Sequence, residues 1–273
     1  MLGECLEKVR ACAPLIHNIT NYVTANDCAN ILLACGGSPI MADDPEEVEE
    51  ITAVCSGLNL NLGTLSRRTI PSMLLAGKKS NELGHPVVLD PVGAGASALR
   101  TKTALQLLEE VRFSVIRGNI SEMKTLAQGN GNINGVDAAA ADMVTATTLE
   151  QTVAFAKKFA KKTGAVISIT GAIDIVADSR IAYCIYNGHR DMTKITGTGC
   201  QLSAMTAAYA AANPENILEA AAAAVCAMGI CGEKAKERMT DLDGNSSYRN
   251  YIIDAVCHLN GDELERGARY EVR

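Results

Sequence analysis

The chain alternates short apolar runs with longer helical patterns, and this alternation constrains its fold more than any other feature. Parallel strands buried by helices on both faces produce such a rhythm. The sequence therefore predicts an α/β three-layer sandwich with a mainly parallel central sheet. The expected strands are Leu15 to Ile19, Ser38 to Met41, Gly57 to Leu60, Val87 to Leu89, Ser114 to Ile116, Val166 to Thr170 and Ile173 to Ala177.

The pattern changes after Ile175, where IVADSRIAYCIYNGH predicts two strands joined by a bend at Asp178 and Ser179. We expect this segment to add an antiparallel extension at one edge of the sheet. The last third of the chain is rich in alanine and predicts helices. No linker-like segment rich in proline or serine divides the sequence, so we expect one domain over residues 1–273.

Charge and hydropathy exclude several classes of function. The 25 Lys and Arg against 31 Asp and Glu give a net charge of -6, which leaves no basic surplus for nucleic acid or an anionic membrane. The longest nearly uncharged apolar run, residues 220–232, is shorter than the roughly 18 residues that span a bilayer. The first ten residues carry charges where a signal peptide is apolar. We expect a cytoplasmic protein with no nucleic-acid or membrane partner.

The ten cysteines predict neither disulfides nor a zinc site. No C-x-x-C pair occurs, and the four histidines are scattered. A chain of this length without a secretion signal keeps its thiols reduced. We therefore expect all the cysteines except Cys200 to pack as small apolar side chains.

Ligands bind beyond the carboxyl ends of the strands in an open parallel sheet, so the residues that follow each strand are the candidates for a site. The segment VVLDPVGAGAS places Asp90 at the end of a strand and follows it with Gly93 and Gly95. The carboxylate could hold a metal ion, and the glycines would let backbone amides approach a phosphate. The spacing to Ala98 also fits a loose Rossmann fingerprint, and a purely structural turn is a further alternative.

Two other strands end in residues suited to phosphate chemistry. In VIRGNISEM, Arg117 would suit a phosphate and Glu122 a hydrated magnesium ion. Asn119 and Glu122 are also spaced as the N-cap and N3 residues of a capping box, which is a purely structural explanation. In VISITGAIDIV, Thr170 could donate its hydroxyl to a phosphate, or Thr170 and Gly171 could form a simple hairpin corner.

The sharpest signal is the run Gly197, Thr198, Gly199 and Cys200, which opens a long helix of small residues. The free N–H groups and the dipole of a helix N-terminus attract anions. Such a site would hold the charge that develops on a phosphoryl group during transfer. The Walker A pattern is absent from the chain, and a Gly-rich turn packed against a neighbour is the structural alternative.

Polar residues also cluster after the first strand, where LIHNITNYV contains His17, Asn18 and Asn21. They could recognise a small heterocycle, or they could satisfy the loop backbone. Met41 ends the second strand and is followed by DDPEEVEE, which we interpret as the solvated start of a helix capped by Asp44.

In this order the segments resemble the ribokinase-like kinases, and more narrowly the hydroxyethylthiazole kinase family of thiamine salvage. The resemblance covers nearly the whole chain. Its specific part is LDPVGAGA combined with a cysteine that ends TGTGC, because the wider superfamily usually has aspartate where Cys200 stands. The other matching segments are IHNITNYVTAN, GGSPIMADDPEEV, NLNLGTLS, IRGNISE and ITGAID.

The resemblance implies a ribokinase-like sandwich that transfers the γ-phosphoryl group of ATP to the primary alcohol of 4-methyl-5-(2-hydroxyethyl)thiazole, with Mg²⁺. It also implies a homotrimer with sites between subunits, so that residues 17–21 would serve a neighbour's pocket. Alternatives within the fold are a pyrimidine-alcohol or pyridoxal kinase and an ATP-dependent NAD(P)H-hydrate dehydratase. Two alternatives from other functional classes are a Rossmann oxidoreductase and a nucleotide-binding sensor without turnover.

The resemblance also implies roles for individual residues. The departure from the family pattern is Ala172, where a glutamate often follows the Thr-Gly pair. The implied assignments are catalysis for Cys200, Gly199 and Thr198; ATP binding for Arg117, Thr170 and Asn119; substrate binding for Met41, Gly197 and Asn21; and metal binding for Asp90 and Glu122.

Overall fold

The computed structural model describes residues 1–129, 144 and 147–273. Within this part nine strands form one sheet, in the order β2-β1-β3-β4-β5-β6-β7-β8-β9. The pairs from β2 to β6 are parallel, and the pairs from β6 to β9 are antiparallel. The strands are β1 (Leu15–Ile19), β2 (Ser38–Met41), β3 (Gly57–Asn61), β4 (Val87–Asp90), β5 (Val115–Asn119), β6 (Val166–Thr170), β7 (Asp174–Ala177), β8 (Ala182–Ile185) and β9 (Tyr270–Val272).

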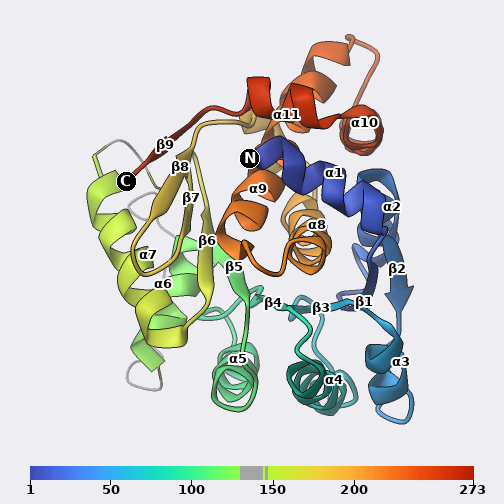
Figure 1. Cartoon of the computed structure of the whole chain (residues 1–273), viewed down its shortest axis with the longest axis vertical. Helices are drawn as coiled ribbons and strands as arrows, with labels where there is room; N and C mark the ends of the chain where they lie inside the picture. Colours follow the sequence, from blue (N-terminus) through green and yellow to red (C-terminus); the bar gives the residue numbers. More distant parts are fainter. Residues whose placement is uncertain (130–143, 145–146) are drawn as a thin grey trace.

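Helices cover both faces of the sheet, which confirms the predicted α/β sandwich with an antiparallel edge (Figure 1). One layer contains α3 (Val48–Val54), α4 (Thr69–Leu83), α5 (Ala98–Glu110), α6 (Ile120–Gln128) and α7 (Leu149–Thr163). The other contains α1 (Leu2–Cys12), α2 (Ala25–Cys35), α8 (Thr198–Ala212) and α9 (Ile217–Arg238), with α10 (Asn245–His258) and α11 (Gly261–Gly267) packed outside them.

The order of the strands creates a switch point between β1 and β3. From β1 the chain crosses to β2 on one side, and it then returns to add β3 on the other side. Crevices open beyond the carboxyl ends of the strands at such a point, and ligands bind there. Ile19 of β1 pairs with Leu60 of β3, so the residues that follow these two positions lie beside each other at the crevice.

The sheet face beneath α8 changes from apolar to polar along the strands. Val88 and Val115 pack with the helices of this layer. Side chains alternate between the faces of a strand, so Asp90 and Arg117, each two positions further on, share that face. The strand middles therefore build the core under α8, and the strand ends place polar groups under its N-terminus.

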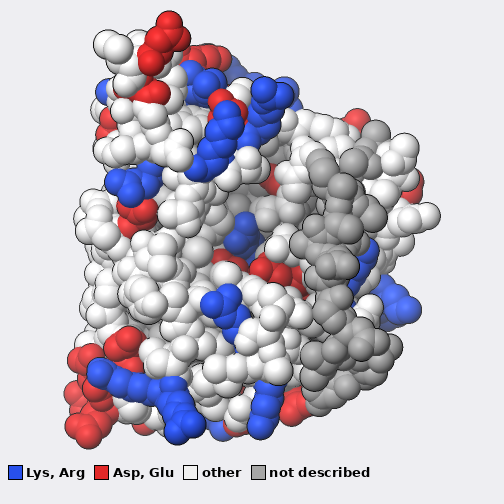
Figure 2. Space-filling model, turned by 180° about the vertical axis from the view of Figure 1, so that it is seen from behind, with Lys and Arg blue, Asp and Glu red and all other residues white. Residues whose placement is uncertain are grey.

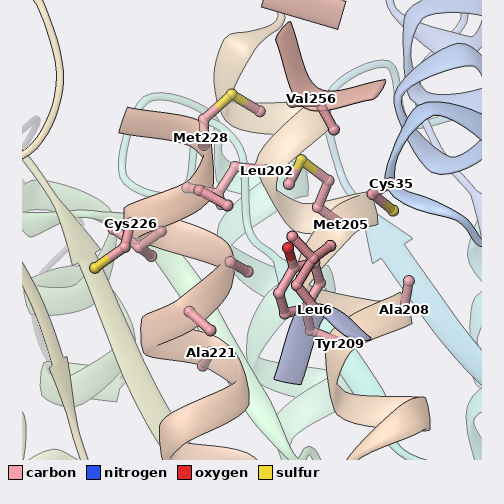
Figure 3. Close-up of a cluster of buried hydrophobic side chains, with 14 of the residues drawn as sticks. Leu6, Cys35, Leu202, Met205, Ala208, Tyr209, Ala221, Cys226, Met228 and Val256 are labelled. Atoms are coloured by element: carbon pink, nitrogen blue, oxygen red, sulfur yellow. The ribbon is translucent and has the colours of Figure 1, made fainter. Parts of the chain in front are cut away.

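A core of small and flexible side chains joins α8 to its neighbours (Figure 3). Met205 and Tyr209 of α8 are fully buried, and Cys226 of α9 and Cys35 of α2 belong to the same cluster. The alanines of α8 let the helix approach the sheet closely. All ten cysteines fall in the described residues and are free.

Three features differ from the sequence expectations. The helix expected from Pro45 begins at Val48, because Asp44 instead accepts a hydrogen bond from the Glu46 N–H in a preceding turn. Helix α1 at the N-terminus, and α11 with β9 at the C-terminus, were not expected as elements. Tyr270–Val272 adds to the antiparallel edge by pairing with β8. None of the described helices has the length and hydropathy to cross a bilayer.

Tyr209 gives a test of this core. Its side chain is fully buried, and its hydroxyl has no hydrogen-bond partner among the described residues; burial raises its pKa well above the ordinary value. Removing an unpaired buried hydroxyl relieves a desolvation cost, so Tyr209→Phe should leave the free energy of unfolding unchanged or raise it by about 1 kcal/mol.

Tyr248 is the matched control, because it is also buried but donates to the Gly232 carbonyl at 2.9 Å. Tyr248→Phe should lower the free energy of unfolding in urea by about 1 kcal/mol. Equal losses in the two variants would contradict this account of the Tyr209 hydroxyl.

Candidate active site

The centre of the candidate site is the carboxylate of Asp90 at the end of β4. Its Oδ2 accepts hydrogen bonds from Asn61 Nδ2 at 2.9 Å, Ser203 Oγ at 2.7 Å and Arg117 Nη1 at 3.3 Å. Its Oδ1 is buried and has no partner within the described residues. One oxygen is thus fixed by three donors, and the other is available to a ligand.

Arg117 connects this carboxylate to two other predicted positions. Its Nη2 donates to Thr170 Oγ1 at 2.8 Å. A Cβ added at Gly199 would lie 2.6 Å from Arg117 Nη1, so the guanidinium rests against the first turn of α8. The Arg117 guanidinium is therefore the point at which the ends of β4, β5 and β6 meet the start of α8.

Cys200 joins the same network through two asparagines. Its Sγ accepts from Asn21 Nδ2 at 3.2 Å and from Asn61 Nδ2 at 3.3 Å. The two asparagines also bond to each other, from Asn21 Nδ2 to Asn61 Oδ1 at 3.0 Å. A continuous set of hydrogen bonds thus runs from Thr170 through Arg117, Asp90 and Asn61 to Cys200.

The N-terminus of α8 has the features of an anion site. Gly197 is its N-cap residue with φ 89°, in the left-handed region, and no side chain caps the helix. A Cβ at Gly197 would lie 2.5 Å from Thr24 Cγ2, so glycine is required here for two reasons. The first N–H groups of α8, including those of Thr198 and Gly199, have no partner within the helix and can face an anion.

Asn119 and Glu122 form the capping box that their spacing predicted. Asn119 Oδ1 accepts from the Glu122 N–H at 2.9 Å, and Glu122 Oε2 accepts from the Asn119 N–H at 2.8 Å. Glu122 Oε1 also accepts from the Gly93 N–H at 2.9 Å. Burial raises the pKa of Glu122, and the negative charge of Asp90 adds to that shift. The structural explanation is thus satisfied, and the influence of Asp90 on this pKa shows that the two carboxylates belong to one electrostatic neighbourhood.

Met41 and His17 are predicted positions that stand outside the network. Met41 ends β2, two strands away from Asn61, and its side chain is 41% exposed. His17 is fully buried, and its ring nitrogens bond Thr52 Oγ1 and the Ala42 carbonyl, both at 2.9 Å. His17 therefore serves the structure of the loop, which was one of the two interpretations of LIHNITNYV.

Three residues of the site were not predicted from the sequence. Asn61 and Ser203 hold Asp90 Oδ2. Asp174 accepts from the Gly171 N–H at 2.8 Å and so shapes the corner after Thr170. The run LNLNL becomes a signal only once both faces of its strand are known to be buried, because Asn59 and Asn61 then form a buried polar row beside the leucines. Ser203 and Asp174 carry no comparable signal.

The oxygen ligands of this site fit a cation that is bound partly by the protein and partly by the phosphates of a substrate. Among the described residues no group of three or more His, Cys, Asp or Glu side chains could hold a metal. Asp90 with its orphaned Oδ1 and nearby Glu122 supply two carboxylates, and Mg²⁺ characteristically binds one or two carboxylates together with substrate phosphates. The face turned away from the view of Figure 1 has a hollow near its middle, where basic and acidic side chains reach the floor (Figure 2).

Asp174 predicts a pH dependence of stability. Burial raises the pKa of its carboxyl from 3.8 to about 7. In the unfolded chain the group ionises near its ordinary pKa, so its ionisation favours unfolding as the pH rises from about 4 to about 7. Asp174→Asn keeps an acceptor for the Gly171 N–H and cannot ionise. At pH 8 the variant should be more stable than the wild type by about 1–2 kcal/mol in urea unfolding. The Asp174 side chain is partly exposed, and solvent reduces the free energy that its pKa shift would otherwise give.

At pH 4 the two proteins should be equally stable. Asp178→Asn is the control, because Asp178 accepts from the N–H groups of Arg180 and Ile181 in the next turn, and it should show no gain at pH 8. A gain for Asp174→Asn that is the same at both pH values would refute the assignment.

Known proteins resemble this chain over nearly its whole length. The model of the Hydroxyethylthiazole kinase family matches residues 6–262. A hydroxyethylthiazole kinase from Clostridium acetobutylicum is 66% identical over 271 residues, which are 99% of each chain. A solved structure of a hydroxyethylthiazole kinase protein from Pyrococcus horikoshii has a TM-score of 0.88 at 34% identity and covers 100% of this chain and 98% of its own.

The fold extends to more distant kinases. A Bacillus subtilis pyridoxal kinase, solved as an ADP complex, has a TM-score of 0.59 at 19% identity over 86% of this chain and 98% of its own. This similarity supports the ribokinase-like sandwich. The family model and the close relatives go further: the chain belongs to the hydroxyethylthiazole kinase family.

Proposed function

We propose that the protein transfers the γ-phosphoryl group of ATP to the primary alcohol of 4-methyl-5-(2-hydroxyethyl)thiazole. The observation that carries this proposal is the network that joins Thr170, Arg117, Asp90 and Cys200 at the N-terminus of α8. Membership of the family supplies the substrate. It does not favour a Rossmann oxidoreductase, a pyrimidine-alcohol or pyridoxal kinase, a hydrate dehydratase or a sensor without turnover.

On the donor side, Arg117 and Thr170 would bind the phosphates of ATP, with Asn119 beside them at the end of β5. The Arg117 guanidinium already lies against Gly199, so phosphate held by it would also meet the N–H groups of α8. Positioning and charge stabilisation provide most of the catalysis in phosphoryl transfer. Thr198 and Gly199 would therefore act through their backbone amides.

Asp90 and Glu122 would hold Mg²⁺. When bound, the ion neutralises charge on the phosphoryl oxygens. Asp90 Oδ1 is the ligand that the structure leaves free, and the donors on Oδ2 keep that carboxylate in one orientation. Ser203 Oγ, at 2.7 Å, is the shortest of these contacts.

On the acceptor side, Cys200 would lie beside the attacking hydroxyl, with Asn21, Gly197 and Met41 around the thiazole. The sulfur is partly exposed and accepts from two amides, so it is oriented and can still accept from a hydroxyl. The alcohol loses its proton late in a loose transition state. A weak base or a simple hydrogen-bond acceptor is therefore sufficient at this position.

We further propose a cytoplasmic homotrimer with sites between subunits, following the family resemblance. Tyr22 and Val23, which follow Asn21 directly, are 82% and 57% exposed. Met41 is exposed too, on the edge strand β2. Contact with a second subunit would cover these apolar side chains and bring its residues to the site.

A panel of alcohols with coupled detection of ADP tests the reaction. With hydroxyethylthiazole and Mg²⁺ present, the enzyme should release ADP from ATP, and mass spectrometry should detect the phosphate ester of the alcohol. Pyridoxal, hydroxymethylpyrimidine and a reaction without acceptor should stay near background, and so should hydroxyethylthiazole with the metal chelated. ADP release with a pyridine or pyrimidine alcohol alone would replace this proposal with a pyridoxal or pyrimidine-alcohol kinase.

Cys200 gives a second prediction. If the amides at the start of α8 carry more of the catalysis than the thiol does, Cys200→Ser and Cys200→Ala should keep measurable turnover, reduced by about 10- to 100-fold. Cys257→Ala, at an exposed thiol on α10, should match the wild type. Turnover at background in both Cys200 variants, with both substrates still bound, would make the thiol indispensable and reverse this ranking.

A further inference from the structure

We propose that Asn61 is a positioning residue, which fixes the acceptor-side thiol of Cys200 relative to the metal-side carboxylate of Asp90. The inference rests on the proposed function for its catalytic consequence. Its structural content, that one amide holds both groups, stands on the contacts alone. Asn61 Nδ2 lies 2.9 Å from Asp90 Oδ2 and 3.3 Å from Cys200 Sγ.

The side-chain amide of Asn61 has both hydrogens and its oxygen engaged. Nδ2 has two hydrogens, one for the carboxylate and one for the sulfur. Oδ1 accepts from Asn21 Nδ2 at 3.0 Å and from the Gly63 N–H at 2.9 Å. A flipped amide would turn its oxygen toward the carboxylate of Asp90 and its NH₂ toward two donors. The network therefore permits only one orientation.

The backbone holds Asn61 as firmly as the side chains do. It ends β3, where it pairs with Asp90 of β4 across the parallel ladder. It is 1% exposed, and a Cβ added at Gly63 would lie 2.7 Å from Asn21 Cβ, so the loop after β3 packs tightly onto the other asparagine. Asn61 cannot move without disturbing the pairing between the ends of β3 and β4, and Asp90 lies at the end of β4.

This placement matters because the two groups act on opposite partners of the transfer. Asp90 would face the phosphoryl group and its cation, and Cys200 the attacking hydroxyl. In-line transfer needs the two partners at a fixed separation, and a misplacement of about 1 Å can cost about 100-fold in rate. Loss of Asn61 should therefore slow the chemical step more than it weakens the binding of either substrate.

Asn59 provides a matched control within the same strand. It lies two residues earlier on the same face of β3 and is fully buried. Its side chain donates to Asn18 Oδ1 at 3.1 Å and makes no hydrogen bond to Asp90 or Cys200 among the described contacts. Asn59→Ala and Asn61→Ala therefore remove equal side chains from equally buried positions.

The first experiment is steady-state kinetics on these two variants. Asn61→Ala should lower kcat by about 100-fold with both KM values within about threefold of the wild type, whereas Asn59→Ala should keep kcat within about threefold. Thermal melting with and without ATP verifies that each variant folds and binds nucleotide. A fall in kcat that is the same for both, or a loss confined to KM, would overturn the proposal.

The second experiment needs no turnover and uses Asn61→Asp, which changes an N–H donor to an oxygen at constant shape. The sulfur then loses an N–H donor and faces a carboxyl oxygen in its place, so its reactive thiolate is disfavoured. Alkylation of Cys200 by iodoacetamide, followed by peptide mass spectrometry, should slow by about tenfold relative to wild type and Asn59→Asp. The exposed Cys257 is the internal reference and should keep its rate.

An unchanged or faster rate at Cys200 would show that Asn61 only fills space, and would overturn the proposal even if Asn61→Ala failed to fold. Absence of turnover in the wild type with hydroxyethylthiazole would instead contradict the proposed function. The alkylation result would still decide whether Asn61 holds the thiol.

Discussion

The buried carboxylate of Asp90 is the constraint on which the rest of the site depends. A charge removed from water is tolerated only when it is paired and hydrogen-bonded. Its donors come from three different elements: Asn61 from β3, Arg117 from β5 and Ser203 from α8. These elements must therefore meet at one point before the charge is stable, and that point becomes the centre of the site. The same donors leave the second oxygen without a partner in the described part of the chain, so the arrangement that stabilises the fold also orients a carboxylate oxygen that could bind a cation.

The later turns of helix α8 stabilise the fold, and its first turn contributes to the site. Its later turns place Met205 and Tyr209 in the core, where burial of apolar surface holds the helix on the sheet. Its first turn contains Gly197 and Gly199, which leave room for Thr24 and for the guanidinium of Arg117. The helix can thus bring unpaired N–H groups close to a cationic side chain and a carboxylate. The apolar half supplies the packing that keeps this otherwise unfavourable cluster of polar groups in place.

The sequence predicted the layered fold and its strands other than β9 because apolar runs alternate with helical patterns, and it predicted the capping box of Asn119 and Glu122 because both partners lie within one turn. It did not reveal Asn61 or Ser203, whose roles arise from contacts between elements distant along the chain. The alternation around Asn61 resembles that of a strand with one solvated face. Only the helices on both faces of the sheet turn that pattern into a buried polar row. The start of α3 was misplaced because Asp44 caps a turn instead of the helix.

The amides around position 200 offer a physical reason for a cysteine there. Asn21 and Asn61 both donate N–H groups here, so the site requires an acceptor atom at this position. Either sulfur or oxygen can be that acceptor. With a neutral thiol, the charges of Asp90, Glu122 and Arg117 sum to a single negative charge, which one divalent cation more than balances. A carboxylate at position 200, which the wider superfamily usually has, would add a second negative charge in the same low-dielectric space and require stronger compensation. A cysteine keeps the hydrogen-bonding pattern while lowering that electrostatic demand, and the cost is a weaker base in a reaction that needs little from its base.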